Sequence, residues 1–391
     1  MLDSKQLRVL VVTRNLPPLR GGMERLNLHM AVELAKEFEV TIIGPRGASA
    51  SLPAAISVEE INVTPLWKFF IGTCGRSMQA ALRLRPHVVL GGSGLVAPFV
   101  WLAARISSAR MALYVHGLDL IAPHPIYRAL WRPLIRLADL CLVNSDHTAK
   151  LASTVGVAPD RIAVLHPGVD LPTAETLAVP NDFRIRFGLG TRPLLLSVGR
   201  LIERKGLLEF VENALPQIVS EMPDVCLVVL GDEMPARLQG SNEGLGERIR
   251  LRAAELAIAE NLQFIGQQDD ATLAKAWRAA AAHVFPVREV PGDVEGFGMV
   301  AVEAAAHGLP TVAFSVGGVP DAVRNGISGY LVPAGDYAQL VERLLSLLRA
   351  RAGAPMRDSA RHFAESFAWG SFGVKLRERI RQIVNRQVAG T

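Results

Sequence analysis

Short apolar runs alternate with amphipathic segments through the first part of the chain. The run 8–13 is apolar and strand-sized, and the segment 22–38 after it repeats its apolar residues at helical spacing. Further strand-sized apolar runs follow at residues 40–43, 87–90, 111–115 and 140–143. Strands that alternate with helices are typical of a doubly wound α/β architecture, so the pattern predicts a parallel sheet covered by helices.

The same alternation starts again in the second part of the chain. Its strand-sized runs lie at residues 194–198, 225–230, 263–265, 283–285, 311–314 and 330–332. A turn-rich stretch from His166 to Pro180 separates the two patterns. We therefore expect two Rossmann-like domains in one chain.

The domain boundaries follow from these patterns. We expect an N-terminal domain at residues 1–170, a linker at 171–190 and a C-terminal domain at 191–368. The tail 369–391 reads as a basic amphipathic helix that packs back across the domains. Ligands of open α/β sheets bind beyond the carboxyl ends of the strands, so we expect the two domains to face a common cleft.

The composition is that of a globular protein in a reducing compartment. Hydrophobic residues make up 50% of the chain and charged residues 20%, and the three cysteines are too scattered for a disulfide framework or a zinc site. The polar start has no secretory signal, and a glycine-rich turn interrupts the long apolar stretch 88–106. We expect a cytoplasmic protein without a membrane-spanning helix.

The net charge of +5 is carried by the N-terminal domain. Residues 1–170 have 18 Lys and Arg against 12 Asp and Glu, whereas the remainder has 24 against 25. The basic residues are dispersed, and no nucleic-acid-binding motif accompanies them. This favours an anionic membrane surface or a small anion as a partner over nucleic acid.

Two glutamates flank a Gly-Phe-Gly turn at the predicted start of a helix. Glu295 precedes the turn, and Glu303 lies about two helical turns further on, on the same side. Phe297, Gly298 and Met299 would direct backbone N–H groups toward a ligand, and two carboxylates at two depths suit a polyhydroxylated one. The alternative is that Glu295 is a charge favoured by the helix dipole and Glu303 an ordinary solvated residue.

Two basic residues follow the first predicted strand of the C-terminal domain. Arg200 and Lys205 lie in one loop and helix start, where a guanidinium fork and an ammonium group would clamp a diphosphate. A solvated basic turn is the alternative. Gly266, after another strand of this domain, exposes backbone that would border a nucleobase, although an ordinary turn fits it equally well.

The N-terminal domain offers two comparable strand ends. Gly21 and Gly22 follow its first strand and open a helix, an arrangement that suits an anion. The G-x-G-x-x-G fingerprint is absent, which argues against a nicotinamide enzyme. His116 ends a later strand and is followed by Gly117 and Asp119; it is a catalytic candidate, with a structural hydrogen bond as the alternative.

In order and type, these motifs resemble those of the retaining glycosyltransferases of family 4, which have the GT-B fold. The resemblance covers nearly the whole chain, because it also includes His166-Pro167-Gly168-Val169-Asp170, Gly317-Gly318-Val319-Pro320 and Asn325-Gly326. It implies that Arg200 and Lys205 bind the donor diphosphate, Glu303 the ribose and Glu295 the transferred sugar. The backbone of residues 297–299 would also contact the donor.

The resemblance implies roles for the N-terminal domain as well. Gly22 would lie beside the diphosphate and His116 beside the anomeric carbon, whereas Gly21 and Asp119 are candidates for acceptor binding. Such enzymes transfer a hexose with retention and need neither a metal ion nor a cofactor. Residues 288–296 look similar to bacterial enzymes related to the phosphatidylinositol mannosyltransferases, which favours GDP-mannose over a UDP-hexose as donor.

We therefore expect a hexosyltransferase that acts on a glycan or lipid-linked acceptor in the synthesis of cell-envelope polysaccharide, lipopolysaccharide or glycolipid. Residues 65–70, with Arg76, Arg83 and Arg85 nearby, would contact the inner face of an anionic membrane; a packed loop and helix is the alternative. The alternative functions are a GT-B sugar-nucleotide epimerase and a non-catalytic subunit that binds a sugar nucleotide.

Overall fold

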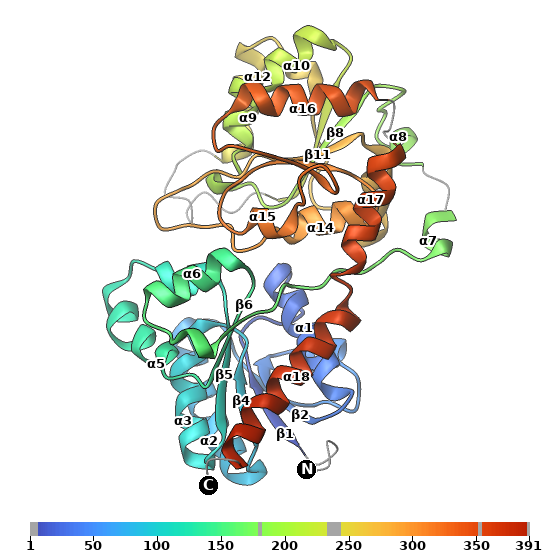
Figure 1. The fold of residues 1–391 in the computed structure, drawn as a ribbon. Helices are drawn as coiled ribbons and strands as arrows, with labels where there is room; N and C mark the ends of the chain where they lie inside the picture. Colours follow the sequence, from blue (N-terminus) through green and yellow to red (C-terminus); the bar gives the residue numbers. More distant parts are fainter. Residues whose placement is uncertain (1–6, 179–181, 233–243, 351–353, 389–391) are drawn as a thin grey trace. The chain divides into compact units, whose positions relative to one another are not determined.

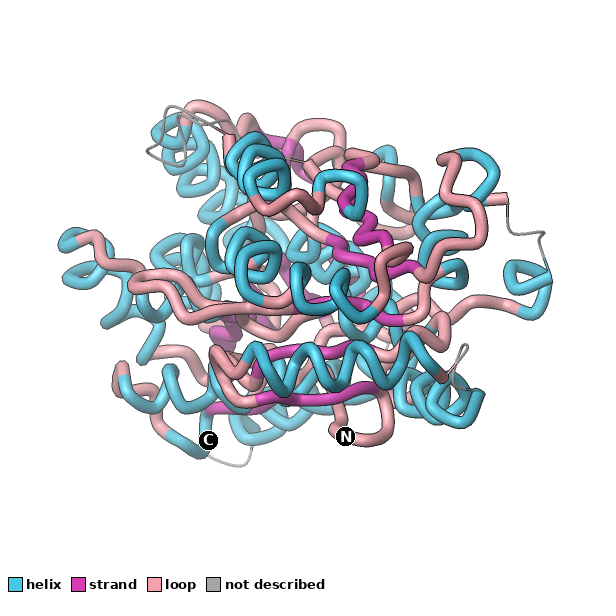
Figure 2. Tube along the Cα trace, turned by 90° about the horizontal axis from the view of Figure 1, so that it is seen from above, coloured by secondary structure: helices cyan, strands magenta, loops and turns pink. Residues whose placement is uncertain are grey.

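The chain forms two compact units in the computed structural model, which describes residues 7–178, 182–232, 244–350 and 354–388 (Figure 1). Unit 1 consists of Met1–Gly168 together with Trp369–Thr391, and unit 2 of Val169–Ala368. Each unit has its own parallel sheet, with helices that connect successive strands (Figure 2). The predicted α/β class with two doubly wound sheets is thereby confirmed.

A seven-stranded parallel sheet forms the centre of unit 1. Its spatial order is β3-β2-β1-β4-β5-β6-β7. The strands are β1 (Arg8–Val12), β2 (Glu39–Pro45), β3 (Ser57–Ile61), β4 (Val88–Gly91), β5 (Arg110–Val115), β6 (Leu140–Val143) and β7 (Ile162–Val164). Its longer helices are α1 (Gly22–Ala35), α2 (Leu66–Leu84), α3 (Ala97–Ser107), α6 (Asp146–Thr154) and α18 (Trp369–Val388), and its short ones are α4 (Gly117–Ile121), η4 (Tyr127–Trp131) and α5 (Arg132–Arg136).

Unit 2 is built on a six-stranded parallel sheet of order β10-β9-β8-β11-β12-β13. The strands are β8 (Leu194–Val198), β9 (Cys226–Leu230), β10 (Leu262–Phe264), β11 (Ala282–Phe285), β12 (Thr311–Phe314) and β13 (Gly329–Val332). The helices are α7 (Ala174–Ala178), α8 (Phe183–Arg186), α9 (Leu207–Asn213), α10 (Leu215–Glu221), α12 (Leu245–Glu255), α13 (Asp270–Ala279), α14 (Met299–Ala306), α15 (Val319–Ala322), α16 (Tyr337–Arg349) and α17 (Ala354–Glu365).

The central strands are buried on both faces, which explains why they appear as apolar runs in the sequence. β4, β6, β9, β11 and β12 are buried along their whole length. Two strands of unit 1 did not appear in the sequence pattern. β3 has the polar sequence SVEEI at the sheet edge, and β7 has only three residues. β3 lacks the continuous apolar run that marks the central strands, and the apolar run of β7 is short.

The predicted linker 171–190 lies within unit 2 and carries α7 and α8, although residues 179–181 of it are outside the described ones. Val169 at the start of unit 2 donates a backbone hydrogen bond of 2.8 Å to the carbonyl of Phe367. The chain enters and leaves unit 2 at adjacent points.

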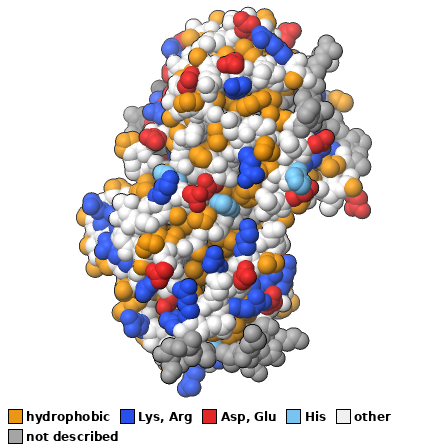
Figure 3. Space-filling model, viewed as in Figure 1, with side chains coloured by type: hydrophobic (Ala, Val, Ile, Leu, Met, Phe, Trp, Pro, Cys, Tyr) orange, Lys and Arg blue, Asp and Glu red, His pale blue; other side chains and the backbone are white. Residues whose placement is uncertain are grey.

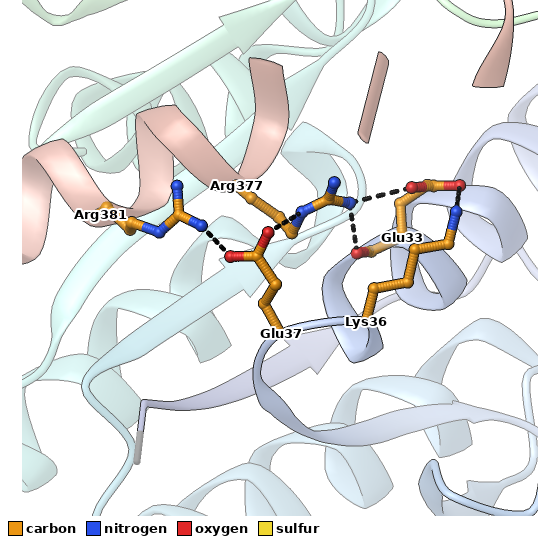
Figure 4. A network of polar contacts seen from close by, with 5 residues as sticks. All are labelled: Glu33, Lys36, Glu37, Arg377 and Arg381. Carbon is orange, nitrogen blue, oxygen red and sulfur yellow. Dashed lines mark hydrogen bonds and ion pairs between the residues drawn. The ribbon is translucent and has the colours of Figure 1, made fainter. Parts of the chain in front are cut away.

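The C-terminal helix α18 packs on α1 within unit 1. Arg377 is 7% exposed, and its guanidinium donates to Glu33 Oε2 and to Glu37 Oε1, both at 2.9 Å (Figure 4). Arg381 extends the network to Glu37. At the start of the helix, the Trp369 ring stacks on His29 at a centroid distance of 4.0 Å. The tail thus completes the N-terminal unit.

Candidate functional site

The strand order of unit 2 reverses between β8 and β11, and the charged residues predicted to bind the donor diphosphate and sugar follow these two strands. β8 and β11 are neighbours in the sheet, but β9 and β12 lie on their opposite sides. Such a switch point leaves an opening beyond the carboxyl ends of the strands, which is where α/β proteins bind ligands. Arg200 and Lys205 follow β8, and Glu295 follows β11.

Glu295 lies between two cations at this point. Its Oε2 accepts a hydrogen bond of 2.7 Å from Lys205 Nζ and a second one from Arg204. The Nε of Arg204 is 3.0 Å from Asp293 Oδ1, so this guanidinium joins the two acidic side chains of the loop. The side chains of Arg204, Glu295 and Lys205 are only 8%, 12% and 19% exposed. The structure therefore brings Lys205 and Glu295 together, as expected for two residues of one site.

The two charged partners adjust each other's pKa. Burial alone would raise the pKa of the Glu295 carboxyl, but the charges and hydrogen bonds of Lys205 and Arg204 outweigh it and hold this pKa below its usual range. Burial lowers the pKa of the Lys205 ammonium, and Glu295 partly opposes that shift. Lys205 also lies over the ring of Phe285, 4.7 Å from its centroid.

A buried histidine packs against Phe285, the residue over whose ring Lys205 lies. The ring of Phe285 stacks on His283, whose Nδ1 is 3.1 Å from Thr311 Oγ1. Burial, together with the nearby charge of Lys205, lowers the pKa of His283 to about 3. His283 is therefore neutral at physiological pH and adds no positive charge to those of Lys205 and Arg204.

Arg200 lies in the same loop but is exposed, unlike Arg204. Its charge is close enough to lower the pKa of Lys205. A solvent-exposed guanidinium beside a buried ammonium group fits a clamp that is completed by an anion. The sequence interpretation missed Arg204, because an arginine within Glu-Arg-Lys reads as a surface charge and nothing local signals its burial.

The loop before α14 is fixed by close backbone contacts. Gly318 donates to the Glu295 carbonyl at 2.9 Å, and a Cβ on Gly318 would lie 2.1 Å from the Gly296 carbonyl oxygen. Gly298 precedes the first helical residue, Met299, with φ 98°, and a Cβ there would meet the Phe285 ring at 2.9 Å. Only glycine satisfies both positions, so the Gly317-Gly318 motif holds the Glu295 loop in place.

The other predicted donor residues of unit 2 are arranged around this loop. Phe297 is 3% exposed and belongs to the hydrophobic core, so its backbone and not its ring is available to a ligand. Glu303 lies on α14 and is half-buried between fully buried neighbours. Gly266 has φ 74° with open space at its Cβ position and lies beyond β10, two strands from the switch point.

Unit 1 has its own switch point between β1 and β4. Gly22 is the first residue of α1 after β1, and both Gly21 and Gly22 are exposed. Glu24 in the first turn accepts a hydrogen bond of 2.8 Å from the Asn15 amide. A Cβ on Gly21 would lie 2.4 Å from Glu24 Oε2, so the Glu24 side chain would have to move if another residue replaced this glycine.

His116 caps the helix α4 that follows β5. Its backbone N–H donates to Asp119 Oδ2 at 2.8 Å, so the carboxylate of Asp119 has a structural partner. The Nε2 atom of His116 is buried and has no hydrogen-bond partner among the described residues. Burial lowers the pKa of His116, although Asp119, the Gly92 backbone and Glu24 act in the opposite direction. The imidazole therefore keeps one nitrogen available for a ligand.

Two further predictions concern metals and membranes. The described part of the chain contains no group of three or more His, Cys, Asp or Glu side chains placed to hold a metal ion. Among the described helices, none combines the length and apolar character that crossing a membrane requires.

Comparison with known proteins gives matches along most of the chain. The family model described as Glycosyltransferase Family 4 matches residues 20–172, and the one described as glycosyl transferases group 1 matches residues 181–366. The chain is 34% identical over 301 residues to D-inositol 3-phosphate glycosyltransferase of Mycobacterium marinum, which covers 75% of this chain and 60% of the relative. It therefore spans less than two thirds of that relative.

A second relative is matched along almost its whole length. It is named GDP-mannose-dependent alpha-(1-6)-phosphatidylinositol monomannoside mannosyltransferase, from Mycolicibacterium smegmatis, and is 27% identical over 395 residues, 95% of this chain and 97% of the relative. Among solved structures, Anabaena HepE in complex with UDP superposes with a TM-score of 0.76 at 17% identity, over 96% of this chain and 100% of that one. The latter likeness confirms the fold.

Proposed function

Because the chain belongs to the family 4 glycosyltransferases, with a GT-B fold, we propose that it transfers a hexose from a nucleotide diphosphate sugar to a hydroxyl group of a glycan or lipid-linked acceptor. The observation that carries the proposal is the group formed by Lys205, Arg204 and Glu295 at the switch point of unit 2. The fixed positive charges suit a leaving diphosphate, and the carboxylate beside them suits the hydroxyl groups of the transferred sugar.

The proposed chemistry is retaining and independent of metal. Arg200 and Lys205 stabilise the negative charge that develops on the departing diphosphate, while Glu295 accepts hydrogen bonds from the transferred sugar and Glu303 from the ribose. Backbone N–H groups of residues 297–299 add to the donor contacts. The leaving phosphate oxygen accepts the proton of the acceptor hydroxyl, so no strong general base is required.

We propose GDP-mannose rather than a UDP-hexose as the donor. The support is the mycolicibacterial relative, whose name includes GDP-mannose and which is matched over nearly its full length. The UDP-bound HepE structure is only 17% identical, so it supports the fold and is no argument about the nucleobase of the donor.

We also propose that the enzyme works at the cytoplasmic face of an anionic membrane. Trp67 and Ile71 on α2 are 59% and 67% exposed, and α2 contains no acidic residue. The segment 120–138, which includes η4 and α5, likewise contains only basic charged residues. Helix α2 contacts this segment, because the ring centroids of Phe70 and Trp131 are 5.8 Å apart. Basic side chains gather at the edge of unit 1 near α5 (Figure 3).

Thermal unfolding of the full chain with a panel of GDP- and UDP-sugars, in EDTA and then with Mg²⁺, tests the donor proposal. A donor at 100 times its dissociation constant should raise the free energy of unfolding by about 2.7 kcal/mol. Arg200→Ala should abolish this stabilisation, whereas Arg349→Ala, which alters an exposed ion pair on α16, should keep it. Stabilisation by UDP-sugars alone would overturn the GDP-mannose assignment, and a requirement for Mg²⁺ would overturn metal independence.

A further inference from the structure

Arg204 is the most buried of the three cations that follow β8. Its side chain is 8% exposed, against 19% for Lys205 and 12% for their common partner Glu295. Both cations meet the same carboxylate oxygen, because Arg204 and Lys205 each donate a hydrogen bond to Glu295 Oε2. One negative charge therefore has two positive partners, and one of them can leave without exposing the buried carboxylate to an unpaired state.

The backbone fixes Arg204 against the loop that follows β11. The Arg204 carbonyl oxygen accepts a hydrogen bond of 3.0 Å from the N–H of Arg288 in that loop. A Cβ on Gly206 would lie 2.0 Å from the Pro286 carbonyl oxygen, so the chain after Arg204 packs directly on the same loop. Arg204 is therefore held in place by its main chain as well as by its ion pairs.

Lys205 has a different environment. Burial lowers the pKa of its ammonium group, Glu295 opposes this shift, and the charges of Arg204 and Arg200 add to it. The ammonium group lies over the ring of Phe285, and Arg200 beside it is exposed. A lysine whose charged form is disfavoured in this way gains stabilisation when an anion arrives. Lys205 is thus the cation of the pair that is suited to an incoming ligand.

The contact between Arg204 and Asp293 is the weaker of the two that the guanidinium makes. Arg204 Nε is 3.0 Å from Asp293 Oδ1, but neither atom has a hydrogen-bond partner among the described residues, so the contact is an ion pair without hydrogen-bond geometry. The side chain of Asp293 is also 31% exposed, and water screens its charge. Glu295 is therefore the main partner of Arg204.

We propose that Arg204 is a positioning residue for the donor diphosphate: by neutralising Glu295, it frees Lys205 to bind the phosphate groups. Without Arg204, Lys205 alone of these two cations would remain on the carboxylate, and the diphosphate would compete with Glu295 for it. Arg204 stays on the carboxylate and does not contact the donor. The inference rests on the proposed function, because it concerns the same donor site.

Isothermal titration of the full-length protein with inorganic pyrophosphate and with GDP tests the proposal. The variants are Arg204→Met, Arg204→Lys, Asp293→Asn and the double variant Arg204→Met/Glu295→Gln, and circular dichroism checks that each is folded. Arg204→Lys keeps a cation for Glu295 but lacks the planar fork that also reaches Asp293. The double variant removes the carboxylate that Arg204→Met leaves with one partner fewer, so it should keep the fold if the single variant does not. Arg248→Met, at an exposed ion pair of α12, is the control.

The expected affinities separate neutralisation of Glu295 from other roles of Arg204. Arg204→Met should bind both ligands about tenfold more weakly than the wild type, which is within the coupling expected for residues of one ion network. Arg204→Lys, Asp293→Asn and Arg248→Met should stay within about threefold of the wild type. The double variant should regain the wild-type affinity, because no carboxylate then competes for Lys205.

The pKa of Lys205 in the ligand-free protein gives a second readout. It should rise in Arg204→Met, because the lysine loses a repulsive charge and keeps the attraction of Glu295. Carbon NMR of lysine labelled at Cε measures this pKa, and Lys205→Arg assigns the resonance. An unchanged pKa would overturn the inference without any ligand, since it would show that Arg204 does not act through Lys205.

Two binding results would also overturn it. A folded double variant that binds pyrophosphate as weakly as Arg204→Met would mean that Arg204 contacts the diphosphate itself. Equal losses in Arg204→Lys, Asp293→Asn and Arg204→Met would mean that the link between the two carboxylates is what matters. Failure of the wild type to bind either ligand would instead count against the proposed function, while the pKa of Lys205 would still test the inference.

Discussion

Two arginines in the loop after β8 differ in burial, and we expect them to differ in function for that reason. Arg204 is held between Asp293 and Glu295 and is buried, whereas Arg200 is exposed. A buried ion pair has lost its hydration, so removing one partner leaves an unpaired charge in the interior. An exposed arginine has no such consequence for folding and is available to a ligand.

We therefore expect opposite results from the two arginines. Arg204→Met should lower the free energy of unfolding by about 3–5 kcal/mol, because Glu295 and Asp293 lose a buried partner. Arg200→Ala should change it by less than about 0.5 kcal/mol and affect donor binding instead. Urea denaturation of both variants is the measurement, and equal stability losses would contradict the assignment of Arg200 to a ligand.

His283 should make the protein sensitive to moderate acid. Its pKa is about 3 in the folded chain against 6.5 normally, so between these values the unfolded chain binds a proton that the folded chain does not. The free energy of unfolding should therefore fall as pH decreases through this window, by up to about 1.4 kcal/mol per pH unit from this residue.

His283→Leu should remove that part of the slope, measured by urea denaturation between pH 6.5 and pH 4. Thr311→Val is the matched control, because it removes the same hydrogen bond but keeps the titrating imidazole. If the slope were as steep in His283→Leu as in the wild type, another group would be responsible for the acid sensitivity.

At the scale of elements, α18 is attached to α1 by a buried ion network. Arg377→Met should destabilise unit 1 by about 3–5 kcal/mol, because Glu33 is buried and would keep only Lys36 as a partner. Arg379→Met, on the same helix but exposed, should have little effect. Denaturant unfolding of the two variants measures the difference, and similar values would show that the network contributes nothing to the packing of α18.

The helix α2 presents apolar side chains and no acidic ones, which suits an anionic lipid surface. The double variant Trp67→Ser/Ile71→Ser should bind phosphatidylglycerol vesicles about tenfold more weakly or worse, because both side chains lose their burial in the interface. Vesicle flotation at two salt concentrations measures this, with the exposed Val374→Ser on α18 as control. Equal binding to phosphatidylcholine vesicles would contradict an electrostatic contribution.

At the scale of the whole molecule, the first unit depends on the last helix of the chain. Trp369, Phe372, Leu376, Ile380 and Ile383 of α18 are all buried. A chain ending at residue 368 should therefore lose the cooperative unfolding of unit 1, whereas unit 2 has its own core and should keep its stabilisation by the donor. Calorimetry with and without nucleotide sugar distinguishes the two transitions, and an unchanged unit 1 would refute this dependence.

Much of the fold was predictable because its signals are local. Central parallel strands are buried on both faces and therefore appear as continuous apolar runs, which identified both sheets. The edge strand β3 was missed because its sequence is polar, whereas β7 was missed although its three residues are apolar. Within the site, the glycines around residue 298, Lys205 and Glu295 were each singled out from residue type and spacing, but the ion pair between Lys205 and Glu295 appeared only in the structure.

The sequence by itself determined the repeated strand and helix pattern and the presence of two parallel sheets, and it supplied the donor-site residues as predictions. Only the tertiary structure decided which side chains meet: Arg204 reaches Glu295 from 91 positions away, and Arg377 reaches Glu33 from 344. It also decided that the side-chain oxygens of Ser93, Tyr127 and Asn144 are buried, with no hydrogen-bond partner in the part of the chain that the structure describes. The reason is that periodicity reports on neighbours along the chain, whereas burial and pairing depend on which elements pack together in space.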